Sequence, residues 1–330
     1  MPDRPLVPVI VGPTGVGKTA VAVALARLLP LTVISADARQ VYRHLDIGTA
    51  KPGPDVRREA PHAGIDLIDP GERYSAGRFA REAVSWLTQA RAEGRQPVVV
   101  GGTGFYVRAL ADGLFHEPPL DPAHREPLRV WASGLPAATA AHWAARLDGR
   151  FAGGGRQRAI RAIEVALLTG RPLSWWQREA RETGALSPWY IHLTLPRETL
   201  HRRIAARVDA MLAAGLVGEV RALLARGVPA TASGLDGVGY REVAAMLAGR
   251  LPESGLREAI VVATRKYAKR QETWFRHQLR DEGRGTGDGY LWTLDATESP
   301  DVLAATIMER WRATARRSSP VPRPSSRVRA

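Results

Sequence analysis

The sequence contains no cysteine, few aromatic residues and no long apolar run. With 0 cysteines in 330 residues, a disulfide framework, a thiolate zinc site and a cysteine nucleophile are all excluded. No window approaches the roughly 18 apolar residues of a membrane span, and the first residues lack the layout of a secretory signal. We therefore expect a cytoplasmic, monomeric protein with no membrane association and no obligatory protein partner, whose chemistry uses oxygen, nitrogen or a bound ion.

Lysine is also scarce, although the chain is strongly basic. The 47 Lys+Arg residues exceed the 33 Asp+Glu residues and leave a net charge of +14, which favours a polyanionic partner such as nucleic acid. A GC-rich genome also produces an arginine bias, and part of the excess lies in residues 312–330, which we predict to be a disordered basic tail. Charge therefore favours nucleic acid without deciding the matter.

Apolar runs and helical patterns alternate along the chain, which predicts an α/β fold: a P-loop core with a parallel sheet flanked by helices, plus a helical insertion domain. We expect strands at 6–11, 31–37, 96–102 and 189–195, and helices at 20–29, 75–93, 197–224 and 252–279. The expected domains are the first part of the core (1–115), a helical insertion (116–186), the second part of the core with C-terminal helices (187–311) and the tail (312–330).

A glycine-rich turn between the first strand and the first helix matches G-x-x-x-x-G-K-[ST]. Backbone N–H groups of such a turn wrap an anion, the lysine reaches the outer phosphate, and the hydroxyl can ligate Mg²⁺. An ordinary glycine-rich turn is the alternative. The residues of this phosphate cradle are Gly12, Pro13, Thr14, Gly15, Val16, Gly17, Lys18 and Thr19.

The next strands end in residues that suit the same edge of the sheet. Asp37 follows the second strand, where a carboxylate can accept a proton from an attacking nucleophile, although a turn aspartate is an equally ordinary role. Gly101, Gly102 and Thr103 end the third strand, in place of the acid that supports the metal in hydrolytic P-loop proteins. Thr103 suits a second anion contact or a simple helix N-cap.

Six segments in order resemble the tRNA dimethylallyltransferase (tRNA isopentenyltransferase) family. They are GPTGVGKT, SADARQVYRHLDIGTAKP, VGGTGFYVRAL, QRAIRAIEV, GVGYRE and TRKYAKRQETWFR. The resemblance implies transfer of a dimethylallyl group from dimethylallyl diphosphate, with Mg²⁺, to N6 of the adenosine 3′-adjacent to the anticodon of tRNA. The cradle would then hold a diphosphate leaving group.

The resemblance also implies the roles of individual residues. Asp37 would accept the proton of the amine, Lys18 and Arg207 would contact the diphosphate, and Thr103 would position the leaving group or Asp37. Thr19 would contact the metal ion. For Arg203, one turn before Arg207, we predict a solvent-facing side chain.

Contact with the anticodon loop of tRNA is expected at the Asp37 turn, in the insertion and on the C-terminal helix. In the insertion, Ile160, Ile163 and Leu167 are predicted to pack inward and leave polar side chains on the other face. On the C-terminal helix, Tyr267, Gln271 and Trp274 share one face, and Trp274 and Phe275 are predicted to pack in the core. The candidate tRNA-binding residues are Asp37, Ala38, Arg39, Gln40, Gln157, Arg158, Arg161, Lys266, Lys269 and Arg270.

The chain departs from the family pattern at two places. Ala38 replaces the usual serine after the aspartate, and AGGG at 152–155 replaces the HPND segment ahead of the Gln157 helix. Three other functions remain open: a P-loop small-molecule kinase, a prenyltransferase of free adenine nucleotides, and a non-catalytic RNA-binding protein. The kinase would use the same P-loop and acid, whereas the nucleotide prenyltransferase would not need the basic helices.

Overall fold

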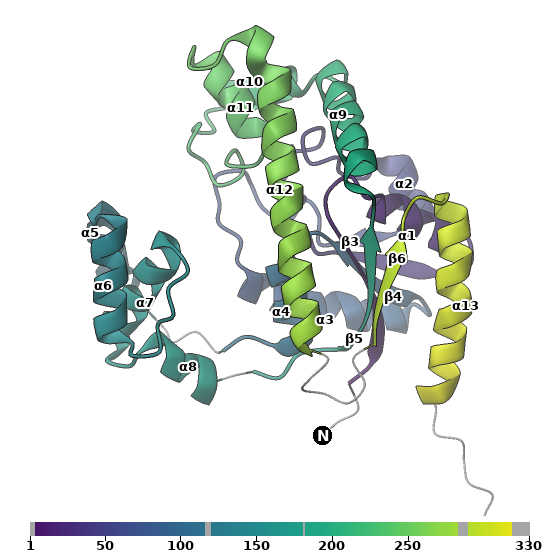
Figure 1. Cartoon of the computed structure of the whole chain (residues 1–330), viewed down its shortest axis with the longest axis horizontal. Helices are drawn as coiled ribbons and strands as arrows, with labels where there is room; N and C mark the ends of the chain where they lie inside the picture. The colour runs from purple at the N-terminus through teal and green to yellow at the C-terminus, as the bar shows by residue number, and fades with distance from the viewer. Residues whose placement is uncertain (1–3, 116–119, 181, 283–289, 319–330) are drawn as a thin grey trace, which may run out of the picture. The chain divides into compact units, whose positions relative to one another are not determined.

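The computed structural model describes residues 4–115, 120–180, 182–282 and 290–318 (Figure 1). The chain divides into two compact units. The core unit comprises Met1–Arg108 and Leu186–Ala330, and the insertion unit comprises Ala109–Ala185. The insertion unit therefore begins earlier than the boundary expected at residue 116.

A six-stranded sheet in the order β3-β2-β4-β1-β5-β6 forms the centre of the core unit. All of its strand pairs are parallel, which confirms the predicted α/β class. The central strands read as continuous apolar runs because both faces of the sheet are covered by helices. The strands are β1 (Leu6–Val11), β2 (Leu31–Ser35), β3 (His62–Ala63), β4 (Gln96–Gly101), β5 (Ser187–Thr194) and β6 (Tyr290–Asp295).

The register of the central strands aligns their carboxyl ends. Val11 at the end of β1 lies opposite Gly101 of β4 and His192 of β5, and Ser35 at the end of β2 lies opposite Val100 of β4. The loops that follow β1, β2 and β4 therefore leave the sheet at the same edge, where ligands of open parallel sheets bind.

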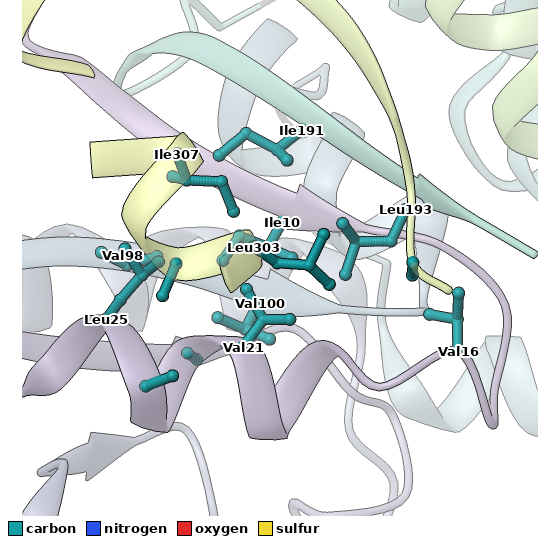
Figure 2. Close-up of a cluster of buried hydrophobic side chains, with 14 of the residues drawn as sticks. Ile10, Val16, Val21, Leu25, Val98, Val100, Ile191, Leu193, Leu303 and Ile307 are labelled. Carbon is teal, nitrogen blue, oxygen red and sulfur yellow. The ribbon is translucent and has the colours of Figure 1, made fainter. Parts of the chain in front are cut away.

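Nine helices begin in the described part of the core unit: α1 (Lys18–Ala26), α2 (Pro54–Glu59), α3 (Ala76–Ala92), α4 (Gly104–Asp112), α9 (Arg197–Ala213), α10 (Leu216–Ala225), α11 (Tyr240–Leu247), α12 (Glu253–Glu282) and α13 (Pro300–Ser318). Helices α1 and α13 pack on one face of the sheet. Leu303 and Ile307 of α13 lie beside Val21 of α1 and Ile10 of β1 in one buried cluster (Figure 2).

The other face of the sheet packs against α3, α4 and α12. Phe275 of α12 is completely buried, as predicted, and its ring lies 5.9 Å from the ring of His192 on β5. Phe79 of α3 stacks on Tyr106 of α4 with ring centroids 4.6 Å apart. The first turn of α4 and the middle of α12 are thereby held near the strand ends.

The structure corrects the predicted elements at several places. The single helix predicted for 197–224 is two helices, α9 and α10, because Gly215 adopts a left-handed φ of +97° between them. Helix α13 continues to Ser318, so residues 312–318 are helical and do not belong to a disordered tail. The rest of the predicted tail, 319–330, lies outside the described residues. Five elements, α2, β3, α11, β6 and α13, were not predicted from the sequence pattern.

In the insertion unit, the described residues after α4 form four helices and the loops that connect them. Its helices are α5 (Pro122–Gly134), α6 (Ala137–Leu147), α7 (Arg156–Thr169) and α8 (Leu173–Glu179). Ala140 and Ala144 of α6 pack against Ala159, Ala162 and Ile163 of α7. The predicted apolar stripe was partly wrong, because Ile163 is buried but Leu167 is 50% exposed.

Among the helices that the structure describes, none combines the length and the apolar character needed to cross a membrane.

Two residues of α13 give a matched test of how this helix is packed. Ile307 is 2% exposed and Val302 is 50% exposed. We expect Ile307→Ala to lower the free energy of unfolding by about 2–5 kcal/mol, since it opens a cavity, and Val302→Ala to change it by less than about 0.5 kcal/mol. Urea denaturation measures both. Equal midpoints for the two variants would show that α13 does not cover the core.

Candidate active site

The phosphate cradle is the turn between β1 and α1. Gly12, Gly15 and Gly17 have φ values of +147°, +84° and +107°, which side-chain-bearing residues rarely adopt. Gly12 also lies so close to the carbonyl of Leu193 that a Cβ would overlap it. The sequence spacing of the glycines therefore follows from the path of the turn.

Lys18 is held inside this turn by its own loop. Its Nζ donates to the carbonyl oxygens of Gly12 and Pro13, both at 2.9 Å. Burial lowers the pKa of Lys18 to about 8; the Asp37 carboxylate acts in the opposite direction and Arg207 adds to the lowering. The ammonium group is thus poorly hydrated and close to other charges, which is the environment of a group that binds an anion.

The segment after β2 forms a tight turn around Asp37. Asp37 Oδ1 accepts a hydrogen bond from the backbone N–H of Arg39 at 2.8 Å, so the turn-aspartate role applies to one carboxylate oxygen. The N–H of Ala38 donates to Thr103 Oγ1 at 3.0 Å. Thr103 therefore links the Asp37 turn to the start of α4, where its carbonyl accepts from Tyr106 N at 2.9 Å.

Charged and phenolic groups surround Asp37. Its carboxylate influences the ionisation of Lys18, Arg207, Tyr106 and Tyr267. Burial, followed by the Asp37 charge, raises the pKa of Tyr267 to about 12. Burial lowers the pKa of Arg207, and Asp37 opposes that change. The proximity of Tyr106 and Tyr267 to Asp37 was not predicted from the sequence pattern.

Two arginines of α9 lie near the cradle. Arg207 Nη2 donates to the carbonyl of Thr49 at 3.4 Å. Arg203 is exposed, as predicted, but its guanidinium also holds the core unit: Nη1 donates to the carbonyl of Val16 in the cradle at 3.2 Å, and Nη2 donates to that of Ala296 at 3.4 Å. Arg203 therefore supports the turn from outside.

The loop that contains the IGTAKP segment is fastened from two sides. Glu219 Oε2 accepts from the N–H groups of Asp46 and Ile47 at 3.0 and 2.9 Å, and Tyr240 OH donates to Glu219 Oε1 at 2.6 Å. On the other side, Lys51 is almost completely buried, and its Nζ lies 2.6 Å from Asp46 Oδ1. The loop thereby places the Thr49 carbonyl where Arg207 meets it.

Two residues predicted to contact tRNA are engaged within the core unit. Gln40 Oε1 accepts from Ser35 Oγ at 2.9 Å, and its Nε2 donates to the carbonyl of Thr49 at 3.4 Å. Arg39 Nη1 donates to the carbonyl of Ser233 at 2.7 Å, and its Nη2 lies 3.7 Å from an Asp236 carboxylate oxygen. Both residues hold the turn, and contact with a base would have to replace these bonds.

The other predicted tRNA contacts lie on two helices. Lys266, Lys269 and Arg270 are exposed on α12, and two of them line a shallow hollow together with Arg241 and Glu258. The predicted contacts of the insertion unit lie on α7: Gln157 and Arg158 are exposed, whereas Arg161 Nη1 lies 3.3 Å from Glu164 Oε2. These helices belong to different units.

Gln271 is a buried polar residue whose role the sequence analysis did not identify. Its Oε1 accepts from the N–H of Thr14 in the cradle at 2.8 Å, and its Nε2 donates to the carbonyl of Gly102 at 2.9 Å. Its spacing from Tyr267 and Trp274 correctly predicted that the three side chains share one face of α12. Only the tertiary structure shows that this face meets two loops of the candidate site.

Acidic ligands for a resident metal ion are few. The described residues contain no group of three His, Asp or Glu side chains arranged to hold a metal. Thr19 is exposed in the first turn of α1, beside Lys18. A Mg²⁺ ion, which usually keeps waters and binds substrate phosphates, fits such a sparse donor set.

Comparisons with known proteins show which family this chain resembles. A family model described as IPP transferase matches residues 40–278, and another described as isopentenyl transferase matches residues 5–58. A tRNA dimethylallyltransferase from Syntrophobacter fumaroxidans is 41% identical over 315 residues, which cover 93% of this chain and 88% of the relative. One from Halorhodospira halophila is 46% identical over 297 residues, with 87% and 92% covered.

Solved structures share the fold. The tRNA isopentenylpyrophosphate transferase of Bacillus halodurans is 30% identical with a TM-score of 0.67, and the match covers 95% of this chain and 99% of that protein. A eukaryotic dimethylallyltransferase acting on tRNA has a TM-score of 0.79 at 24% identity, with 97% and 81% covered. Since the family model spans most of the chain and the relatives match nearly its whole length, this chain belongs to the tRNA dimethylallyltransferase family of prenyltransferases.

Proposed function

We propose that this chain transfers the dimethylallyl group of dimethylallyl diphosphate to N6 of the adenosine 3′-adjacent to the anticodon in tRNA, releasing diphosphate. The observation that carries this proposal is the juxtaposition of a phosphate cradle with Asp37 at one edge of the sheet. Lys18 and Arg207 each interact electrostatically with the Asp37 carboxylate. An anion-binding group and a proton acceptor therefore lie near each other, as a transfer from a diphosphate to an amine requires.

The cradle would bind the diphosphate and stabilise it as it leaves. Lys18 Nζ would exchange its bonds to the Gly12 and Pro13 carbonyls for bonds to phosphate oxygens, and Arg207 would exchange its bond to the Thr49 carbonyl in the same way. As the allylic C–O bond breaks, its electron pair moves to the diphosphate oxygen, and these cations offset the growing negative charge. The strongest interactions are then made in the transition state.

Asp37 would accept a proton from the incoming amine. The adenine N6 lone pair forms the new N–C bond at the allylic carbon, and one N6 proton passes to the carboxylate. The Arg39 N–H occupies Oδ1 and fixes the orientation of the side chain. Thr103 holds the same turn through Ala38. We therefore assign Thr103 to the positioning of Asp37.

A Mg²⁺ ion would be held by the Thr19 hydroxyl together with oxygens of the bound diphosphate and water. The ion supplies further charge neutralisation at the leaving group. Asp37 then remains available for the amine.

The tRNA would have to present its adenosine unstacked, because an N6 amine within the anticodon stack cannot reach the sheet edge. Exposed cations of α12 suit the phosphates of the loop, and the polar face of α7 suits base edges. The assigned residues are Lys266, Lys269, Arg270, Gln157, Arg158 and Arg161.

Transfer of label from radiolabelled dimethylallyl diphosphate to total tRNA tests the proposal, with nucleoside mass analysis to identify the product. We expect Asp37→Asn to lower the rate on the order of 10²–10⁴-fold, since the amide keeps the shape but accepts no proton. Binding of tRNA should persist. Phosphorylation of a small molecule from ATP, without label in tRNA, would instead establish a kinase.

The pKa of Lys18 predicts how diphosphate affinity depends on pH. The group is protonated below about pH 8, so binding of dimethylallyl diphosphate should be strongest there and weaken about tenfold between pH 7 and pH 9. Lys18→Arg keeps its charge over this range and serves as the control for titration of the ligand itself. We expect calorimetry to show that the affinity of the parent protein for dimethylallyl diphosphate, divided by that of Lys18→Arg, falls as the pH rises. Parallel pH profiles would contradict the assignment of Lys18.

Salt dependence separates phosphate contacts from base contacts. Lys269→Gln should weaken the binding of all tRNAs equally. It should also reduce the dependence of tRNA affinity on salt concentration by about one phosphate contact. Arg161→Gln should cost roughly 1–3 kcal/mol and change the preference between cognate and non-cognate loops. Arg312→Gln, at an exposed position of α13, is the control and should do neither. If all three variants match the parent protein, tRNA lies elsewhere.

A further inference from the structure

Gln271 is a residue of α12 that contacts the candidate active site. Its side chain is 7% exposed, and both of its polar atoms are hydrogen-bonded to backbone groups far away in sequence. The Thr14 N–H belongs to the loop after β1, and the Gly102 carbonyl belongs to the loop after β4. One side chain therefore connects the loops that follow β1 and β4 at the functional edge of the sheet.

The two hydrogen bonds demand opposite chemistry from the two ends of the side chain. A backbone N–H needs an acceptor, and a backbone carbonyl needs a donor, so the orientation of the Gln271 amide is set by its partners. An ionised glutamate of the same length only accepts, and a methionine of similar size satisfies neither partner well. A glutamine amide meets both requirements at this distance.

The neighbouring glycines show how closely α12 approaches these loops. A Cβ on Gly102 would overlap the Gln271 amide, and a Cβ on Gly104 would overlap the ring of Trp274, one turn further along α12. The loop after β4 can receive α12 only because it lacks side chains at these points. The contact is therefore tight, and a shift of Gln271 would be transmitted to both loops.

The hydrogen bonds continue from Gln271 to the proton acceptor. Gly102 is followed by Thr103, whose backbone N–H donates to the carbonyl of Ala36 at 3.2 Å and whose hydroxyl accepts from Ala38 N at 3.0 Å. Ala36 and Ala38 flank Asp37 in the chain. A continuous path thus runs from the cradle through Gln271 to both sides of Asp37.

We propose that Gln271 is a positioning residue that sets the spacing between the bound diphosphate and Asp37. It keeps the Thr14 N–H pointing at α12 and fixes the loop that orients the Asp37 turn. This inference rests on the proposed function, because the spacing matters only if one substrate is held by the cradle while Asp37 acts on the other. Misplacement by about 1 Å is enough to cost on the order of 100-fold in rate.

The expected signature is a loss in kcat with little change in KM. Lys18 and Arg207 still bind dimethylallyl diphosphate in a Gln271→Met variant, so we expect KM to change less than about threefold while kcat falls about 10–100-fold. Gln278→Met is the matched control. It makes the same change on the same helix, where Gln278 accepts from Arg108 at 2.9 Å, and should leave kcat unchanged.

A second variant gives a readout that a purely structural role would not produce. Gln271→Glu keeps the acceptor for Thr14, and on protonation it regains a donor for the Gly102 carbonyl. Burial favours the protonated form of such a carboxyl group. The kcat of this variant relative to the parent should therefore recover at least about fivefold from pH 8 to pH 6, whereas the same ratio for Gln271→Met should stay flat.

Amide hydrogen exchange tests the positioning without reference to activity. We expect Gln271→Met to speed exchange of the peptide that contains Thr14 by at least about tenfold, with no such change in Gln278→Met. A parent protein that transfers no label to tRNA would overturn the proposed function and leave this measurement to decide the role of Gln271. Unchanged exchange in Gln271→Met, or unchanged kcat in an active enzyme, would overturn the positioning role.

Discussion

The candidate site depends on the parallel register that ends β1, β2 and β4 at one edge of the sheet. Parallel pairing sends every following loop out on the same side, so groups far apart in sequence meet without long connections. The register is protected at Gly101, where a Cβ would overlap the Ala36 carbonyl and push β4 away from the chain after β2. Loss of that close approach would separate Thr103 from Ala38 and leave the Asp37 turn without its support.

Electrostatics explains why this edge of the sheet suits an anion that binds and is then released. Lys18 and Arg207 are brought together against their mutual repulsion, and backbone carbonyls satisfy part of their donor capacity. Carbonyl oxygens carry only partial charge, so under the proposed function they would give way to phosphate oxygens, which are fully charged. Asp37 offsets the repulsion without forming a direct ion pair that would occupy either cation.

The sequence predicts those parts of the site that are encoded locally. The cradle lies within eight consecutive residues, and the spacing of its glycines predicts the path of the backbone. The strands are recognisable because burial on both faces requires continuous apolar runs. Asp37 and Thr103 could be placed because strand ends in a parallel sheet must meet.

What the sequence did not predict depends on contacts between distant segments. Gln271 and Arg203 look like ordinary polar residues on helices until the loops that they support are in place. Leu167 fits an apolar stripe by spacing, but the helix packs through small alanines on a neighbouring face. Helix α13 was missed because its basic last turns resemble the tail that follows, and only its buried residues reveal it.

The packing of α13 has a consequence for how the protein is made. Synthesis proceeds from the N-terminus, and domains fold as the chain emerges. Ile10 and Val21 are made long before Leu303 and Ile307, which share their cluster. On the ribosome, the apolar side of the growing sheet therefore stays partly uncovered until α13 has been translated. This face is therefore where a chaperone would find the unfinished protein.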